Sequence, residues 1–240
     1  ITCRDWSSDV CSSDLPDNIA GVIYMGNEST FEHRASTPLE STSPYFTQEF
    51  VRCPRFYLGA TNEGGYAMFN VNRFMENMRV PWTIEMVPNY RHAAESEKMF
   101  LAWRMFVSHV FDGRPLARIS GLRALDSPRG TTFQAEIATA NTLVLAKLWY
   151  VYCDDPPYWR DLMWYPVPMR RKEGDLFEAY VHGKTPDAWL VEVLDAGRGV
   201  RGYVTSLPQN LTAKESKVRP PATDGHPRLW RAEKQGGGER

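Results

Sequence analysis

The sequence predicts an α/β fold followed by an all-β region, and two patterns carry this prediction. Between Gly21 and about Gly113, short apolar runs alternate with helical patterns, which is typical of a parallel sheet covered by helices. From Pro115 to about Pro208 the helical signal disappears, and β-rich runs bounded by Gly, Pro and Asp follow one another at intervals of about ten residues. Even spacing of this kind indicates an antiparallel β-sandwich.

The first half contains two predicted helices among three predicted strands. The segment 68–78 has a helical pattern, and 95–113 is longer. In the longer segment one face of a helix collects five apolar residues, and Gly113 ends it. These residues are Met99, Trp103, Phe106, Val107 and Val110. The predicted strands are 21–26, 55–61 and 82–88.

The second half contains six predicted strands. Between Leu143 and Tyr152 successive residues alternate between two faces, which favours a strand. The six runs are 131–138, 142–154, 162–169, 175–183, 188–197 and 201–208. The region 115–210 is therefore expected to be a β-sandwich domain of the immunoglobulin or fibronectin type, after a first domain at 16–114.

The two ends do not show the pattern of a domain. Residues 5–15 read DWSSDVCSSDL, and codons for that stretch spell a short-read sequencing adapter, so we interpret 1–15 as a translated artefact without ordered structure. The alternative is a genuine polar N-terminal tail. Residues 211–240 are polar and contain RPP and QGGGER, which predicts a disordered tail or run-on translation.

Composition excludes several classes of protein. The net charge of −1 gives no electrostatic case for binding nucleic acid or an anionic membrane. No run of apolar residues is long enough for a transmembrane helix. Outside the artefact only Cys53 and Cys153 occur, without metal-ligand spacing, so two buried thiols and no metal site are expected. The compartment is not determined by the sequence, and a periplasmic or secreted location is the working expectation.

Two polar loops follow predicted strands of the first half. The strand at 55–61 runs into a glycine-rich turn with Glu63, and the strand at 82–88 runs into a loop with His92. Ligands meet an open parallel sheet at the carboxyl ends of its strands. There a carboxylate can hold a histidine in one tautomer and stabilise the imidazolium that forms during acyl transfer. The alternative to these catalytic roles is that Glu63 is a solvated carboxylate in a turn and His92 is an ordinary loop histidine.

Neighbouring residues have two possible roles. Asn62, Asn89 and Tyr90 either orient His92 and line a binding pocket or serve the geometry of the turns. Four tryptophans of the second half either stack on sugar rings or fill the core, and core packing is the commoner role. They are Trp149, Trp159, Trp164 and Trp189.

The loops also carry a family resemblance. The GATNE turn, the PNYRH loop and the long helix after it resemble the C-terminal part of an α/β-hydrolase, in particular the acetylxylan-esterase-like and PhoPQ-activated pathogenicity-related groups. The stretches LWYVYCDDPPYWRDLMWYPV and AWLVEV are similar to the small β-sandwich that follows in the second group. The resemblance covers 20–208. It implies an acid at Glu63, a base at His92, a serine nucleophile and no cofactor.

The chain departs from this family pattern in two ways. The acid is Glu beside Asn62 where Asp is usual, which leaves a degenerate acid open. No G-x-S-x-G occurs, so the nucleophile is expected upstream of residue 16. The first functional hypothesis is a parent serine hydrolase, an esterase or peptidase that acts on a small-molecule ester, a peptide or a carbohydrate ester. The alternative is a catalytically degenerate member that binds a glycan or a protein.

Overall fold

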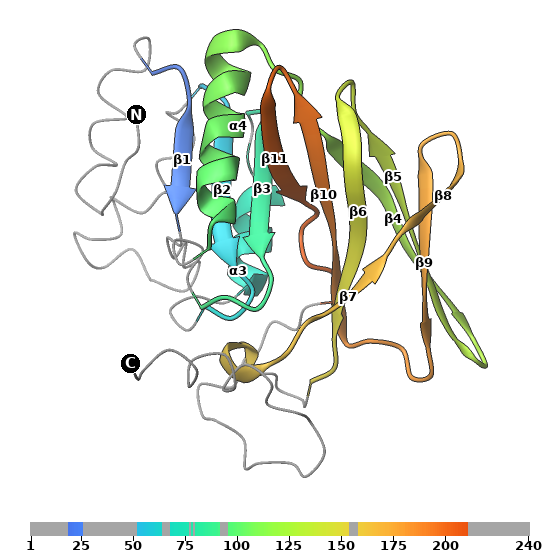
Figure 1. The fold of residues 1–240 in the computed structure, drawn as a ribbon. Coiled ribbons are helices and arrows are strands. Elements are labelled where there is room, and N and C mark those ends of the chain that lie inside the picture. The colour runs from blue at the N-terminus through green and yellow to red at the C-terminus, as the bar shows by residue number, and fades with distance from the viewer. Residues whose placement is uncertain are drawn as a thin grey trace, which may run out of the picture.

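The computed structural model describes residues 19–25, 52–63, 68–76, 78, 80–91, 96–153 and 158–210. In these residues eleven strands form one parallel sheet of three strands and two antiparallel sheets of four strands each (Figure 1). Two α-helices and one short 3-10 helix accompany them.

The parallel sheet carries one helix on each face. Its strand order is β1 (Val22–Met25), β2 (Arg55–Ala60), β3 (Trp82–Val87). Side chains alternate along each strand, so one face packs with α3 (Met68–Glu76) and the other with α4 (Lys98–Asp112). Tyr57 and Met86 lie on the α3 face, and Leu58 and Val87 lie on the α4 face. Gly113, at φ 66°, ends α4 in the left-handed conformation that glycine adopts without cost.

The two antiparallel sheets pack face to face around a shared core, as in a β-sandwich. We call the first the middle sheet; its order is β11 (Val200–Thr205), β10 (Ala188–Gly197), β6 (Thr142–Val151), β7 (Tyr165–Pro168). The second is the outer sheet; its order is β4 (Arg118–Ser127), β5 (Gly130–Ala138), β9 (Leu176–His182), β8 (Arg170–Glu173).

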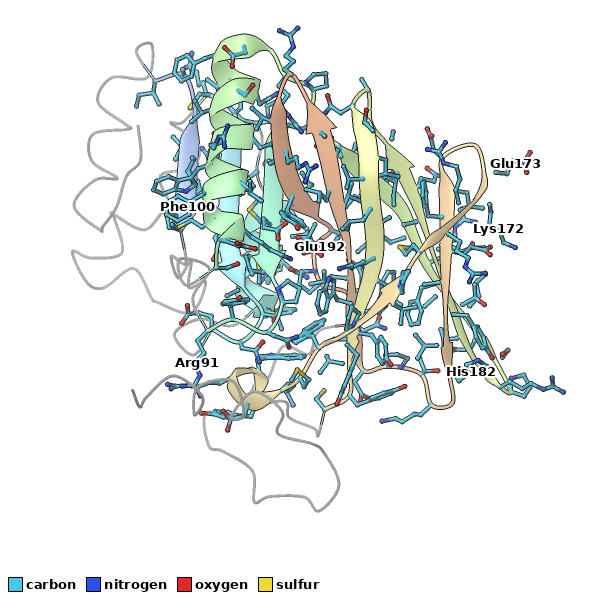
Figure 2. All side chains as sticks on the ribbon, viewed as in Figure 1. Arg91, Phe100, Lys172, Glu173, His182 and Glu192 are labelled. Atoms are coloured by element: carbon cyan, nitrogen blue, oxygen red, sulfur yellow. The ribbon has the colours of Figure 1, made fainter. Side chains whose placement is uncertain are left out.

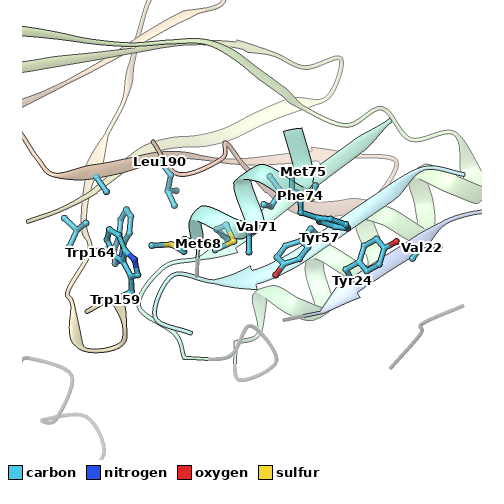
Figure 3. Packing of buried hydrophobic residues seen from close by; sticks show 14 residues of the cluster. Val22, Tyr24, Tyr57, Met68, Val71, Phe74, Met75, Trp159, Trp164 and Leu190 are labelled. Carbon is cyan, nitrogen blue, oxygen red and sulfur yellow. The ribbon is translucent and has the colours of Figure 1, made fainter. Parts of the chain in front are cut away.

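The middle sheet is covered on both faces. From β10, Trp189 and Val191 point into the core shared with the outer sheet. The alternate residue Leu190 points the other way, into the cluster that contains α3 and the parallel sheet (Figure 3). This double cover explains why the first eight residues of β10 are all buried.

The parallel sheet and the middle sheet also meet at β11. Gly202 lies so close to α4 that a Cβ added there would overlap the Met105 side chain. The Met86 amide of β3 donates a hydrogen bond of 2.9 Å to Oγ1 of Thr205 in β11. Val204 joins the α4 core. One side of the parallel sheet therefore abuts an antiparallel sheet (Figure 1).

The predicted fold class is wrong. The described residues are mostly antiparallel β, with only three strands in parallel and two α-helices, and this is not the layout of an α/β-hydrolase. The local strand and helix patterns of the first half are real, but they build only a small parallel sheet. At its β3 edge the parallel sheet meets β11 of the middle sheet. In a wound α/β sheet, another parallel strand with its helix would follow there.

Two smaller expectations are answered by the same residues. Cys53 and Cys153 are thiols, each half-buried. No helix among the described residues is both long and apolar enough to span a membrane.

Candidate functional site

The turn after β2 is buried although all three of its residues are polar. Thr61, Asn62 and Glu63 are 0%, 4% and 9% exposed. The backbone continues the parallel ladder past the strand end, because the Thr61 amide donates to the Val87 carbonyl at 3.1 Å. The backbone amide of the next residue, Asn62, donates to the Tyr90 carbonyl at 3.1 Å.

The turn after β3 lies against the turn after β2. Asn89 adopts φ 64°, a left-handed conformation that asparagine tolerates better than most residues. The backbone amide of Asn89 donates to Oγ1 of Thr61 at 3.0 Å. The two turns thus sit side by side at the carboxyl ends of neighbouring parallel strands, which is the edge where ligands meet such sheets.

The structure describes only one of the two predicted catalytic residues. Glu63 lies in the first turn and is nearly buried. His92 lies outside the described residues, which stop at Arg91 and resume at Ser96, and so does Glu95. The distance between the Glu63 carboxylate and the His92 imidazole therefore stays a prediction.

The predicted binding residue Asn62 spends its side chain on contacts within the protein. Its Oδ1 accepts from Oγ1 of Thr61 at 2.7 Å, and its Nδ2 donates to the Trp159 carbonyl at 2.9 Å. The same Nδ2 reaches the carbonyls of Arg160 and Leu162. These acceptors surround the 3-10 helix Trp159–Asp161, so Asn62 joins the turn after β2 to the connection between β6 and β7.

Asn89 makes a second joint with the same connection. Its Nδ2 donates to the Trp164 carbonyl at 2.9 Å, and its Oδ1 accepts from the Trp164 amide at 2.7 Å. Arg91 adds an ion pair with Asp161 at 3.7 Å. The segment 158–164 of the sandwich region therefore borders both turns. Tyr90, at 38% exposed, is the predicted binding residue that faces outward.

Three of the four tryptophans considered as sugar platforms are core residues. Trp159, Trp164 and Trp189 are buried, and the first two stack at a ring-centroid distance of 6.2 Å (Figure 3). Trp149 is half-buried, and its indole N–H donates to Oε2 of Glu192 at 3.0 Å. Burial of the first three removes them from a surface that could stack on a sugar.

Sequence reasoning missed a second polar constellation, in which Glu85, Lys98 and Glu192 meet between the parallel and middle sheets. Lys98 Nζ forms an ion pair and hydrogen bond with Glu192 Oε1 and lies 3.9 Å from Glu85 Oε1. Glu85 stands in the apolar run TIEMV and Glu192 in WLVEV. A lone acid in such a run was the available signal. Within the described residues, no group of three or more His, Cys, Asp and Glu side chains could hold a metal ion.

Comparison with known proteins adds little. No family model and no curated protein matches the chain. Two crystal structures of wild type OgpA from Akkermansia muciniphila, in different crystal forms, are 11% and 15% identical to it, with TM-scores of 0.25 and 0.26. The aligned part is 40% of this chain and 29% or 28% of theirs. A likeness this slight carries no argument about the fold or the function.

Proposed function

We propose that the parent of this chain is a serine hydrolase of the esterase or peptidase type, with Glu63 as its acid and His92 as its base. One observation carries the proposal: two hydrogen bonds hold the turns after β2 and β3 together. The backbone amide of Asn62 donates to the Tyr90 carbonyl, and the backbone amide of Asn89 donates to Oγ1 of Thr61. Glu63 therefore lies beside the loop that leads, two residues after Tyr90, to His92. The sequence resemblance to the PhoPQ-activated pathogenicity-related group supports the same pair.

The chemistry assigned to the pair is acyl transfer. His92 takes the proton of a serine hydroxyl as the serine attacks a carbonyl carbon, and then returns the proton to the leaving group. The Glu63 carboxylate holds the imidazole in one tautomer and stabilises the imidazolium. The substrate class is an ester, a peptide or a carbohydrate ester. The serine comes from sequence outside the 240 residues, which contain no G-x-S-x-G.

Asn62 and Asn89 have supporting roles in this proposal. Their side chains join the two turns to the segment 158–164, so the sandwich region holds the turn that carries Glu63 and the turn that precedes His92. Tyr90 is the exposed member of the set, and in this proposal it contributes to substrate binding.

A second candidate function is binding without turnover. The family resemblance puts the catalytic acid in the turn after β2, where this chain has Asn62 next to Glu63. The side-chain amide of Asn62 is bound to backbone carbonyls of the segment 159–162. A degenerate acid of this kind favours a module that holds a glycan or a protein at the same edge of the sheet.

The first experiment uses this chain alone and examines the His92 ring by NMR. The proposal expects His92 to be protonated at Nδ1, with slow exchange of that proton, because the proton is donated to the Glu63 carboxylate. Glu63→Ala removes the slow exchange. Glu76→Ala, at an exposed position in α3, is the matched control and leaves it unchanged. Fast exchange of the His92 proton in the unaltered chain contradicts the proposed pair.

The second experiment uses the full-length parent and a fluorophosphonate probe for activated serines. The expected result is labelling of one serine, at a rate that falls by about 10² to 10⁴-fold in His92→Ala. His182→Ala, at an exposed position of β9, is the control and keeps the wild-type rate. A parent that is folded but never labelled supports the binding module and rejects the hydrolase.

A further inference from the structure

Three charged side chains lie in the junction where α4 and β3 pack on the middle sheet. Lys98 comes from the first turn of α4 and Glu85 from the middle of β3. Glu192, which is labelled in Figure 2, comes from the middle of β10. Both carboxylates are essentially inaccessible, at 0% for Glu85 and 1% for Glu192. Burying charged groups is costly unless each one is paired and hydrogen-bonded.

The ammonium group serves the two acids unequally. Lys98 Nζ donates to Glu192 Oε1, and the Trp149 indole donates to Glu192 Oε2 at 3.0 Å, so both oxygens of Glu192 are satisfied. Glu85 Oε1 is 3.9 Å from Nζ, which is too long for a hydrogen bond. Neither oxygen of Glu85 has a hydrogen-bond partner.

The remaining groups around the junction do not supply a second cation for Glu85. Tyr203 of β11 stacks its ring under Lys98, with Nζ 4.4 Å from the ring centroid. Lys147 of β6 lies 6.0 Å from the Trp149 ring, on the Glu192 side, where it is the cross-strand partner of Glu192. Glu97, at the N-cap of α4, adds further negative charge. Among the described residues the junction therefore holds two buried acids and one close cation.

We propose that Glu85 is a proton-operated latch at this junction: its carboxyl group is held neutral while the parallel sheet is docked on the middle sheet, and its ionisation loosens the docking. The neutral carboxyl group fits the site because it leaves Lys98 and Glu192 as a single balanced pair. Ionisation would leave the three side chains with a net charge of −1, and both carboxylates would be charged while inaccessible to water.

Electrostatics act in the same direction. Burial raises the pKa of Glu85 well above its ordinary value, the nearby Glu192 raises it further, and Lys98 opposes them. For Lys98, burial alone would lower the pKa, but Glu85 and Glu192 together raise it. The two acids therefore favour the charged form of Lys98.

The sign of the pH effect follows from the raised pKa of Glu85. Below the unfolded pKa of glutamate, about 4.3, Glu85 is protonated in both states and makes no pH-dependent contribution to stability. Above that value the unfolded chain loses the proton while the folded chain keeps it, so stability falls as the pH rises. The fall ends at the folded pKa of Glu85, above which the latch is open.

The test compares urea unfolding of the wild type and Glu85→Gln, a neutral variant of the same shape, from about pH 4 to pH 9. At the acid end the two are expected to be equally stable. As the pH rises, the ratio of their unfolding constants should change by up to about tenfold per pH unit in favour of Glu85→Gln. Glu173→Gln, at an exposed position of β8, is the control and should follow the wild type.

The junction itself is read from the Met86 amide, which bonds to Thr205. Its hydrogen-exchange protection should fall with pH in the wild type and stay constant in Glu85→Gln. If Glu85→Gln is less stable than the wild type at neutral pH, or if both show the same pH dependence, Glu85 is ionised and the proposal is wrong. Should Glu85→Gln fail to fold, carboxyl ¹³C NMR of the wild type decides, because a Glu85 resonance that titrates near pH 4 overturns the latch.

Discussion

Asn62 shows how much of this molecule depends on single polar side chains at its joints. One amide group contacts three backbone carbonyls of the segment 159–162, nearly 100 residues away in the sequence, and accepts a hydrogen bond from Thr61. The segment has no regular structure beyond one turn of 3-10 helix, so these bonds replace the ladder that a sheet would provide. Its position therefore depends on a side chain of the parallel sheet.

Replacing Asn62 by Ala should destabilise the protein by about 1–3 kcal/mol, because buried carbonyl groups then lose their donor. The measurement is urea unfolding at neutral pH. Thr142→Ala, at an exposed position of β6, is the control and should cost less than about 0.5 kcal/mol. An equal effect of the two substitutions would mean that water replaces the Asn62 amide at no cost.

At the scale of residues, sequence predicts turn chemistry better than buried charge. The polar turns at Asn62–Glu63 and Asn89–Tyr90 follow apolar strands, and both were predicted as loops at one edge of the sheet, although Thr61 was assigned to the strand. Glu85 and Glu192 were missed because an acid in an apolar strand normally marks a solvated face. Both acids are buried only because two sheets meet there. They come from β3 and β10, which are far apart in the chain, and both lie close to Lys98 of α4.

Between elements, β11 packs closely against α4. Gly202 has no side chain, and this lets the strand backbone lie against Met105. Gly202→Ala should therefore destabilise the protein by about 1–3 kcal/mol, because the added methyl group overlaps a side chain in a packed core. Thermal unfolding is the measurement. Arg201→Ala, exposed on the neighbouring position, should change the midpoint little, and an equal shift would contradict the close packing.

Elements with an apolar pattern were predictable, and elements without one were not. The predicted strand at 55–61 and helix at 68–78 are found as Arg55–Ala60 and Met68–Glu76. By contrast, β4 and β8 were missed. The strand β4 is largely exposed and β8 reads RRKE, and both lie at the edges of the outer sheet. Edge strands commonly carry charged residues, so hydrophobic alternation fails there.

For the whole molecule, the wrong fold class has a physical cause. Periodicity reports which residues face a core, but it does not report how many strands a sheet has or what lies beyond its edge. The run AWLVEVLDAG in β10 is apolar on both faces, as in a buried parallel strand, yet its neighbours β6 and β11 are antiparallel. Its burial comes from cores on both sides of the middle sheet.

This shared burial predicts that residues 115–210 do not form an independent domain. Without 16–114, the face of the middle sheet that carries Val151, Ala188 and Leu190 loses its cover, and Glu192 loses Lys98. The isolated segment should bind a dye specific for exposed apolar surface and unfold without a sharp transition. The longer segment 16–210 should not bind the dye and should unfold in a sharp transition. Sharp unfolding of 115–210 without dye binding would show that the sandwich stands alone.

The position of β10 and β11 near the end of the sequence has a consequence for synthesis. The cores on the two faces of the parallel sheet include residues of β10 and β11, which are synthesised only from residue 188 onward. The segments β3 and α4 therefore leave the exit tunnel before the strands that cover them exist. The nascent chain must carry an apolar helix and an unshielded glutamate while the residues between α4 and β10 are synthesised. Chaperones that act on incomplete chains are therefore expected to govern how much of this protein a cell can accumulate.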